Sequence, residues 1–393
     1  MTNAVLRPEV VARTRFLPED IDPLDALGPD SFAWLRDGSG FVTAGVAARI
    51  AAGDVDRALV EFAVDDSVRC PGTGVIAVGA LPFDPRRAAD MIVPATVVGR
   101  TADGQAWRTE VEAVPPAPVV LSPQPTRFTV RQGMDRDAWY AAVARVLVEI
   151  DRDAVRKVVL ARDVCVGADE PFDVARIVRR LRTEQSGCFV FSFDGLVGAS
   201  PELLVARDGL DVWSRPLAGT TPRLDDAALA GLAASAKDAH EHRFVVDALI
   251  EEFERRCDDT VRVSGPEILR FSTLAHLATT ISGRLPSAGG SSALEFAQAL
   301  HPTPAVGGTP NTAAVALIDE LEGGSRGRYA GPVGWVDADG NGEFALALRS
   351  AEIDGSDALL RAGAGIVAGS DPDAEWVETE AKLAPMLSAL IRP

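Results

Sequence analysis

The sequence predicts a mixed α/β fold in which antiparallel strands alternate with long helices. Three strands, expected over residues 188–193, 196–199 and 203–207, are separated only by short turns. Connections this short join antiparallel hairpins. Apolar residues recur at helical spacing between 226 and 256. Since 47% of the 393 residues are hydrophobic, the chain can bury a large core, as one oversized domain or as two.

Residues 1–125 are expected to form a β-rich scaffold. Short apolar runs at 41–44, 72–81 and 91–94 are bounded by glycine, proline and polar residues, which is typical of strands and turns. Few polar side chains cluster there, so no site is predicted in this part of the chain. A proline-rich stretch, 114–125, is interpreted either as a domain linker or as a surface crossing between two halves of one sheet system.

The rest of the chain, residues 126–393, mixes helices and strands. Helices are predicted over 134–150 and 173–182 from their apolar spacing. A proline- and glycine-rich turn at 300–308 leads into another helix. Strands are expected over residues 157–162, 188–193, 196–199, 203–207, 211–215, 344–353 and 359–363, and the longest helix over residues 226–256.

A first candidate site lies near the C-terminus. Ser370-Asp371-Pro372 is a helix start with proline in the first turn. At about 100° per residue, Glu375, Glu378 and Lys382 share one face of that helix, beside an apolar stripe. Neighbouring carboxylates are costly unless a cation bridges them, and their oxygens suit Mg²⁺. The alternative is a solvated helix face with an i,i+4 Glu–Lys pair.

Three glycines precede this helix. Gly363, Gly365 and Gly369 resemble a dinucleotide fingerprint, but their spacing is GxGxxxG, and no strand follows to supply a ribose-binding acid. We interpret them as a glycine-rich turn whose amides face a carboxylate, or as a purely structural tight turn.

Charge and cysteine content exclude several classes of protein. The net charge of -18 argues against nucleic acid or an anionic membrane surface as a partner. The four cysteines are scattered with no CxxC, so neither a disulfide framework nor a zinc site is expected. No apolar run is long enough for a transmembrane helix, and no signal peptide is recognisable, so we expect a soluble cytoplasmic protein.

Seven short blocks, taken together, identify a family. They are KVVLAR (157–162), ASPELL (199–204), PLAGT (216–220), KDAHEHR (237–243), HPTPAVGG (301–308), GRYAGPVG (327–334) and the stretch 363–382. These blocks resemble the chorismate-utilising enzymes, which include isochorismate synthase, salicylate synthase and the large subunits of anthranilate and aminodeoxychorismate synthases. The resemblance covers about residues 126–393. It implies the fold of the anthranilate synthase large subunit, one large domain with two mostly antiparallel β-sheets in a sandwich-like core flanked by helices.

The resemblance also implies a set of site residues. Glu241 and Glu378 would bind Mg²⁺, with Glu375 as a further ligand or in the second shell. His276 would lie against the ring of chorismate, although a core histidine with a satisfied hydrogen bond is the alternative. The remaining substrate-binding residues would be Ala218, Gly219, Thr220, Tyr329, Arg349, Gly363, Gly365 and Lys382.

Two residues are expected to perform the chemistry. Members of the family that use water as nucleophile resemble this chain in having lysine at the position of Lys157, whereas ammonia-using members typically have glutamine. Exchange of a C4 hydroxyl for a C2 hydroxyl from water needs a base and an acid, which would be Lys157 and Glu202. Burial would lower the pKa of the lysine and raise that of the glutamate, as these roles require. The alternatives are a solvated strand end and an exposed turn carboxylate.

The resemblance therefore implies an isochorismate synthase, an isomerase that acts reversibly on chorismate, depends on Mg²⁺ and is a monomer. Salicylate synthase, which goes on to eliminate pyruvate, is the alternative because it uses the same lysine and glutamate. A non-catalytic relative that binds chorismate would require a damaged site, and every motif position is filled. The sequence leaves open whether the product serves siderophore, menaquinone or salicylate formation.

Overall fold

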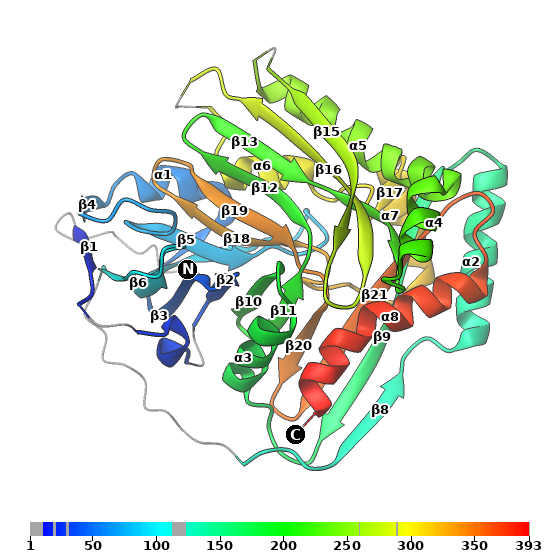
Figure 1. Cartoon of the computed structure of the whole chain (residues 1–393), viewed down its shortest axis with the longest axis horizontal. Helices are drawn as coiled ribbons and strands as arrows, with labels where there is room; N and C mark the ends of the chain where they lie inside the picture. The colour runs from blue at the N-terminus through cyan, green and yellow to red at the C-terminus, as the bar shows by residue number, and fades with distance from the viewer. Residues whose placement is uncertain are drawn as a thin grey trace.

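The computed structural model describes residues 11–18, 21–28, 31–111, 123–258, 260–287 and 290–392. Within these residues the strands form two mostly antiparallel sheets that face one another, with helices outside them (Figure 1). The sheets are joined where β5 meets β6 through the pair Val78 and Ile92. The predicted sandwich-like α/β fold is confirmed.

The first sheet runs from the N-terminal strands to the long antiparallel pair formed by β21 and β9. Every pairing in it is antiparallel except the one between β1 and β4. In order of pairing its strands are β4 (Ala63–Asp66), β1 (Val11–Phe16), β7 (Ala106–Glu110), β6 (Asp90–Arg100), β3 (Ser39–Ala51), β2 (Ala33–Arg36), β10 (Phe189–Phe193), β11 (Leu196–Ser200), β20 (Ser350–Asp354), β21 (Asp357–Ile366) and β9 (Lys157–Ala168), with β8 (Phe128–Gln132) and β17 (Gly308–Thr309) both on β9.

The second sheet is wholly antiparallel. In order of pairing its strands are β5 (Ile76–Ala80), β18 (Pro332–Asp337), β19 (Gly342–Leu346), β12 (Leu203–Asp208), β13 (Asp211–Arg215), β16 (Ala275–Arg284) and β15 (Arg262–Arg270), with β14 (Leu217–Thr221) following β13 along β16.

An aromatic core fills the space between the sheets. Trp34 stacks on Phe189 with ring centroids 5.2 Å apart, and Phe41 meets Trp335 edge to face at 5.9 Å. Trp34, Phe41 and Phe189 come from the first sheet, and Trp335 comes from β18 of the second. Large aromatic side chains bury much apolar area each, so this layer supplies a major part of the stability of the sandwich.

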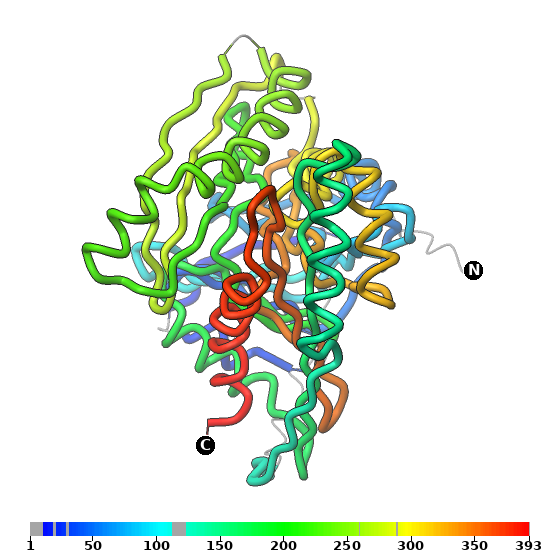
Figure 2. Tube along the Cα trace, turned by 90° about the vertical axis from the view of Figure 1, so that its right-hand side faces the viewer, coloured from blue at the N-terminus to red at the C-terminus, as the bar shows by residue number. Residues whose placement is uncertain are grey.

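Helices cover the outer faces. In Figure 2 the C-terminal helix, in red, lies beside the teal helix that follows β8, where Trp139 and Trp376 meet edge to face with centroids 6.1 Å apart. No helix among the described residues is long and apolar enough to cross a membrane. The helices are α1 (Val55–Leu59), α2 (Arg136–Asp151), α3 (Val174–Glu184), α4 (Asp226–Ala234), α5 (Ala236–Arg256), α6 (Ala293–Leu300), α7 (Asn311–Leu321) and α8 (Pro372–Ile391), with 3₁₀ turns at Pro23–Ala26 and Ala52–Asp54.

The N-terminal strands pair with strands from residues 126–393 in both sheets. β2 pairs with β10, and β5 pairs with β18, so partners more than 150 residues apart in the chain lie side by side. Most of the proline-rich stretch at 114–125 lies outside the described residues.

Two predicted elements are wrong in their continuity. The helix expected over 226–256 is two helices, because Ser235 leaves the helical conformation and its side chain caps α5 by accepting a hydrogen bond from the backbone of Asp238. The strand expected over 344–353 is broken between β19 and β20, where Arg349 adopts a left-handed φ of 49°. This break turns the side chain of Arg349 out of the strand pattern.

Helix α8 begins with an aspartate N-cap that is followed by a proline. The side chain of Asp371 accepts a hydrogen bond from the backbone N–H of Ala374, and Pro372 occupies the first turn. Below the cap, buried Arg162 donates to the hydroxyl of Thr379 at 2.7 Å and lies 3.9 Å above the ring of Trp376. The Asp371 cap and the contacts of Arg162 therefore both hold the first two turns of α8 in place.

We expect Asp371→Ala to destabilise the protein by about 1 kcal/mol, because the N-terminal N–H groups of α8 lose their acceptor. The measurement is the shift of the urea unfolding midpoint. Asp371→Asn keeps an acceptor and is the matched control, expected to stay within about 0.5 kcal/mol of the parent. Equal loss in both variants would show that the cap does not hold the helix start.

Candidate active site

A pocket opens where the start of β9, the strands β14, β16 and β21, and the helices α5 and α8 meet. The space within its walls is about 700 Å³ when the part open to solvent is included. Every predicted site residue except Glu375 lines it. Those residues are Lys157, Glu202, Ala218, Gly219, Thr220, Glu241, His276, Tyr329, Arg349, Gly363, Gly365, Glu378 and Lys382.

Lys157 is buried, although it is the first residue of its strand. Only 1% of its side chain is exposed, and Nζ lies 2.9 Å from Oε1 of Glu241 on α5. The solvated strand end considered from the sequence is therefore excluded. Burial raises the pKa of Glu241, but the charge of Lys157 and its hydrogen bond outweigh burial, and the pKa lies below its ordinary value.

Glu202 is a buried carboxyl in which the cost of burying the charge outweighs the nearby donors and cations. Burial raises the pKa of Glu202 to about 7, and the backbone N–H of Leu217 donates to Oε1 at 3.4 Å. An exposed turn carboxylate is excluded, since the residue is 5% exposed. Near neutral pH a large fraction of this group carries a proton, so it can serve as an acid.

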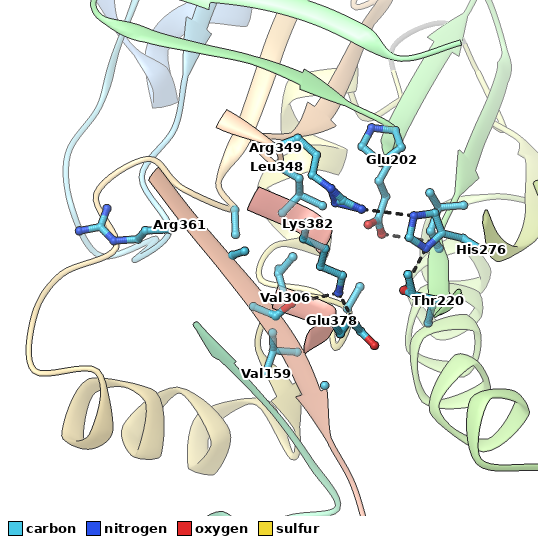
Figure 3. Close-up of a pocket in the computed structure, with 18 of the residues that line it drawn as sticks. Val159, Glu202, Thr220, His276, Val306, Leu348, Arg349, Arg361, Glu378 and Lys382 are labelled. Carbon is cyan, nitrogen blue, oxygen red and sulfur yellow. Dashed lines mark hydrogen bonds and ion pairs between the residues drawn. The ribbon is translucent and has the colours of Figure 1, made fainter. Parts of the chain in front are cut away.

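His276 lies in the pocket wall in a fixed tautomer (Figure 3). Arg349 Nη2 lies 3.3 Å from Nε2, and a guanidinium can only donate, so Nε2 accepts. Nδ1 therefore carries the hydrogen, 3.1 Å from the hydroxyl of Thr220 and 3.3 Å from the carbonyl of Gly219. Burial lowers the pKa of His276 well below its usual value, so the ring is neutral. This histidine is both satisfied and part of the pocket.

Cationic and hydroxyl donors form a second wall. Lys382 Nζ donates to the carbonyl of Gly363 at 3.0 Å and lies 2.5 Å from Glu378. Burial raises the pKa of the Tyr329 phenol, which therefore stays protonated and can donate a hydrogen bond. Figure 3 shows Arg349 and Lys382 pointing into the same space. Together these groups can bind carboxylates.

The glycines are placed differently from the prediction. Gly363 and Gly365 lie inside β21, paired with Ala161 and Val159 of β9, and only Gly369 is in a turn, with φ of 80°. The turn predicted at 363–365 is therefore wrong. A Cβ on Gly365 would lie 2.1 Å from Oε1 of Glu241, because the carboxylate packs directly against this backbone. Glycine is needed here for close approach.

The carboxylates fit a divalent cation bound together with substrate. Glu241 on α5 and Glu378 on α8 border the same pocket. Among the described residues no three His, Cys, Asp or Glu side chains are grouped as a complete metal site. Mg²⁺ in enzymes is commonly held by one or two carboxylates, with substrate oxygens and water completing its shell, so two glutamates are sufficient. Glu375 does not line the pocket, and it is bonded to Lys237 at 2.6 Å.

Sequence analysis missed part of the lining. Arg326 is 3% exposed, donates to the carbonyls of Val159 and Val306 at 2.7 Å each, and is paired with Glu322, four residues earlier in the chain. Helix α7 ends at Leu321, before this pair, so no helical spacing in the sequence pointed to it. Arg361 is counted among the lining residues, but its side chain points away from the others in Figure 3 and donates to the carbonyl of Arg326.

Comparisons with known proteins agree with this geometry. Residues 101–391 match the family model described as chorismate binding enzyme. A relative from Mycobacterium tuberculosis is 42% identical over 338 residues, covering 81% of this chain and 87% of its own. The isochorismate synthase EntC of Escherichia coli is 36% identical over 326 residues, covering 80% of each chain.

Solved structures show the same fold. MenF, the menaquinone-specific isochorismate synthase from Escherichia coli, superimposes with a TM-score of 0.80 at 26% identity, covering 97% of this chain and 95% of that one. Anthranilate synthase component I from Streptococcus pneumoniae reaches 0.71 at 21% identity, covering 95% and 92%, and supports the fold alone. The fold is that of a small-molecule enzyme, and the pocket brings several cationic and acidic side chains together. The chain belongs to the chorismate-binding enzyme family, as the resemblance in its sequence implied.

We expect Gly365→Ala to reduce turnover by about 100-fold, because the new methyl group displaces Glu241 and with it Lys157, and misplacement by about 1 Å can cost this much. Steady-state kinetics measure the effect. Ala364→Gly, at the neighbouring position of the same strand, tests whether any change of side chain there has this effect. Activity near that of the parent in Gly365→Ala would contradict the packing argument.

Proposed function

We propose that this chain is an isochorismate synthase, which converts chorismate to isochorismate. The observation that carries the proposal is that two buried ionisable side chains, Lys157 and Glu202, line one pocket, and that burial raises the pKa of Glu202 to about 7. The family membership and the isochorismate synthases among the relatives support the substrate. Lysine at position 157 supports water as the nucleophile.

The reaction needs two proton transfers on opposite parts of the substrate ring. A new bond forms between a water oxygen and C2, the two ring double bonds shift from C1–C2 to C1–C6 and from C5–C6 to C4–C5, and the bond between C4 and its hydroxyl breaks. Lys157 takes a proton from the attacking water, and Glu202 gives one to the departing hydroxyl. Because one water is gained and one is lost, the reaction is an isomerisation, and the same groups can run it in reverse.

The other pocket residues bind and orient. Arg349, Tyr329 and Lys382 offer donors for carboxylates, and neutral His276 presents its ring edge beside them. Glu241 and Glu378 would hold Mg²⁺. When bound, the cation offsets the negative charge of the substrate and orients a ring carboxylate.

We expect the purified protein to convert chorismate to isochorismate in the presence of Mg²⁺. This activity should be lost in EDTA and return when excess Mg²⁺ is added. Lys157→Ala should lower the rate by about 10²–10⁴-fold, the usual contribution of a general base. Chromatography of the products is the measurement, and Arg152→Ala, on the exposed end of α2, is the control.

Other products would change the assignment. Salicylate with pyruvate as the main product would show a salicylate synthase with the same residues in the same roles. Absence of turnover in the parent protein, with chorismate still bound, would favour a non-catalytic member of the family.

The pH dependence tests the acid separately. Glu202 can donate only while protonated, so we expect kcat/KM for isochorismate formation to fall as pH rises above about 7. Glu202→Gln should have about 10²–10⁴-fold lower activity and should lack this alkaline decline. A pH–rate profile of both proteins decides the matter, and an unchanged decline in Glu202→Gln would assign it to another group.

A further inference from the structure

The chain uses lysine only around this site. The sequence holds three lysines against 36 arginines. Each lysine forms an ion pair with one of the three glutamates predicted for the metal site, and no two lysines share a glutamate. The pairs are Lys157 with Glu241 at 2.9 Å, Lys382 with Glu378 at 2.5 Å, and Lys237 with Glu375 at 2.6 Å.

Lys237 is the lysine without a part in the proposed chemistry. It lies in the first turn of α5, outside the lining of the pocket, and 41% of its side chain is exposed. A cation is unfavourable at a helix N-terminus, so the position is not explained by local helix stability. Surface cations elsewhere in the chain are arginines, so lysine at 237 is not explained by solubility either.

The bond of Lys237 joins the two helices that carry the proposed metal ligands. Glu241 lies four residues after Lys237 on α5, and Glu378 lies three residues after Glu375 on α8. Residues at these spacings share one helix face. The ion pair therefore connects the helices one turn before each ligand. In the part of the chain that the structure describes, it is the one side-chain hydrogen bond between α5 and α8.

Glu375 is held firmly enough to transmit this connection. Its side chain is 3% exposed, and Lys237 donates a hydrogen bond to it. Without Lys237 it would be a buried carboxylate beside the charge of Glu378, an arrangement that is costly for two anions. Separation of the pair would therefore move α5, α8 or Glu375 itself.

We propose that Lys237 is a positioning residue of the metal site, whose bond to Glu375 sets the distance between Glu241 and Glu378. This inference rests on the Mg²⁺ site of the proposed function. A positioning role and a purely electrostatic role predict opposite changes in metal affinity when Lys237 is replaced. If the charge of Lys237 alone mattered, its removal from beside three carboxylates would tighten cation binding.

The test measures metal affinity directly. Mn²⁺ serves as the probe. The protein is incubated with Mn²⁺ and chorismate until the reaction reaches equilibrium, and the electron paramagnetic resonance signal of free Mn²⁺ then gives the concentration of unbound metal. Partners that orient metal ligands typically change affinity by about 10–100-fold. We expect Lys237→Met and Glu375→Gln each to weaken Mn²⁺ binding by such a factor. The double variant should be no weaker than either single variant, since both break the same bond.

Arg136→Met is the matched control. It also removes a cation paired with a carboxylate of the first turn of α8, Asp373, but Arg136 lies on α2. Its affinity should stay within about twofold of the parent, as expected for an exposed pair. Thermal unfolding without metal checks that each variant is folded, and Lys237→Gln replaces Lys237→Met if the latter is not.

Three results would overturn the inference. Mn²⁺ binding by Lys237→Met that equals or exceeds the parent would leave only an electrostatic role. Additive losses in the double variant would show that the two residues act separately. Absence of Mn²⁺ binding by the parent would remove the metal site itself, and product chromatography then shows whether isochorismate formation survives without it.

Discussion

The ion pair between Lys157 and Glu241 constrains much of the surrounding structure. It joins the start of β9 to α5 with both groups largely removed from water. Loss of one partner from a buried pair commonly costs about 3–5 kcal/mol, because the other is left as an uncompensated charge. The pair also requires a bare backbone beside it, which is why β21 presents Gly365 at this register.

The pocket gathers positive charge inside a chain that is acidic as a whole. The protein carries a net charge of -18, yet Lys157, Arg349 and Lys382 converge on one space. Glu241 and Glu378 lie beside two of these cations, 2.9 Å from Lys157 and 2.5 Å from Lys382. Under the proposed function, the cationic side chains would meet the carboxylates of the substrate, and a metal ion held by the two glutamates would bridge it to the protein. Long-range repulsion by the acidic surface is thus offset where binding occurs.

Sequence patterns predicted much of the local structure, and the resemblance to a family predicted most of the residues that line the pocket. The hairpins of β10–β12 follow from short turns between apolar runs, and the motif residues were placed in one pocket by their resemblance to a family. Burial decided the rest. No spacing in the sequence shows that the side chains of Lys157 and Glu202 are buried, because the strands and helices that cover them are distant in the chain.

The errors have physical causes as well. Ser235 ends α4 because its hydroxyl can cap α5, a competition that apolar periodicity does not register. Arg349 interrupts a strand pattern because tertiary contacts, including the one with His276, hold it at positive φ. Glu375 shares a helix face with Glu378, but α5 is placed so that Glu375 pairs with Lys237 and does not line the pocket.

The pairing of β2 with β10 and of β5 with β18 has a consequence for synthesis on the ribosome. The first hundred residues emerge with strand edges whose partners are not yet translated, so the aromatic layer around Trp34 and Phe41 cannot close until β18 is made. Contacts this distant in sequence form slowly, and unpaired edges in the meantime favour association with other chains. Until β10 and β18 are made, the N-terminal part of the nascent chain therefore carries strand edges without their native partners.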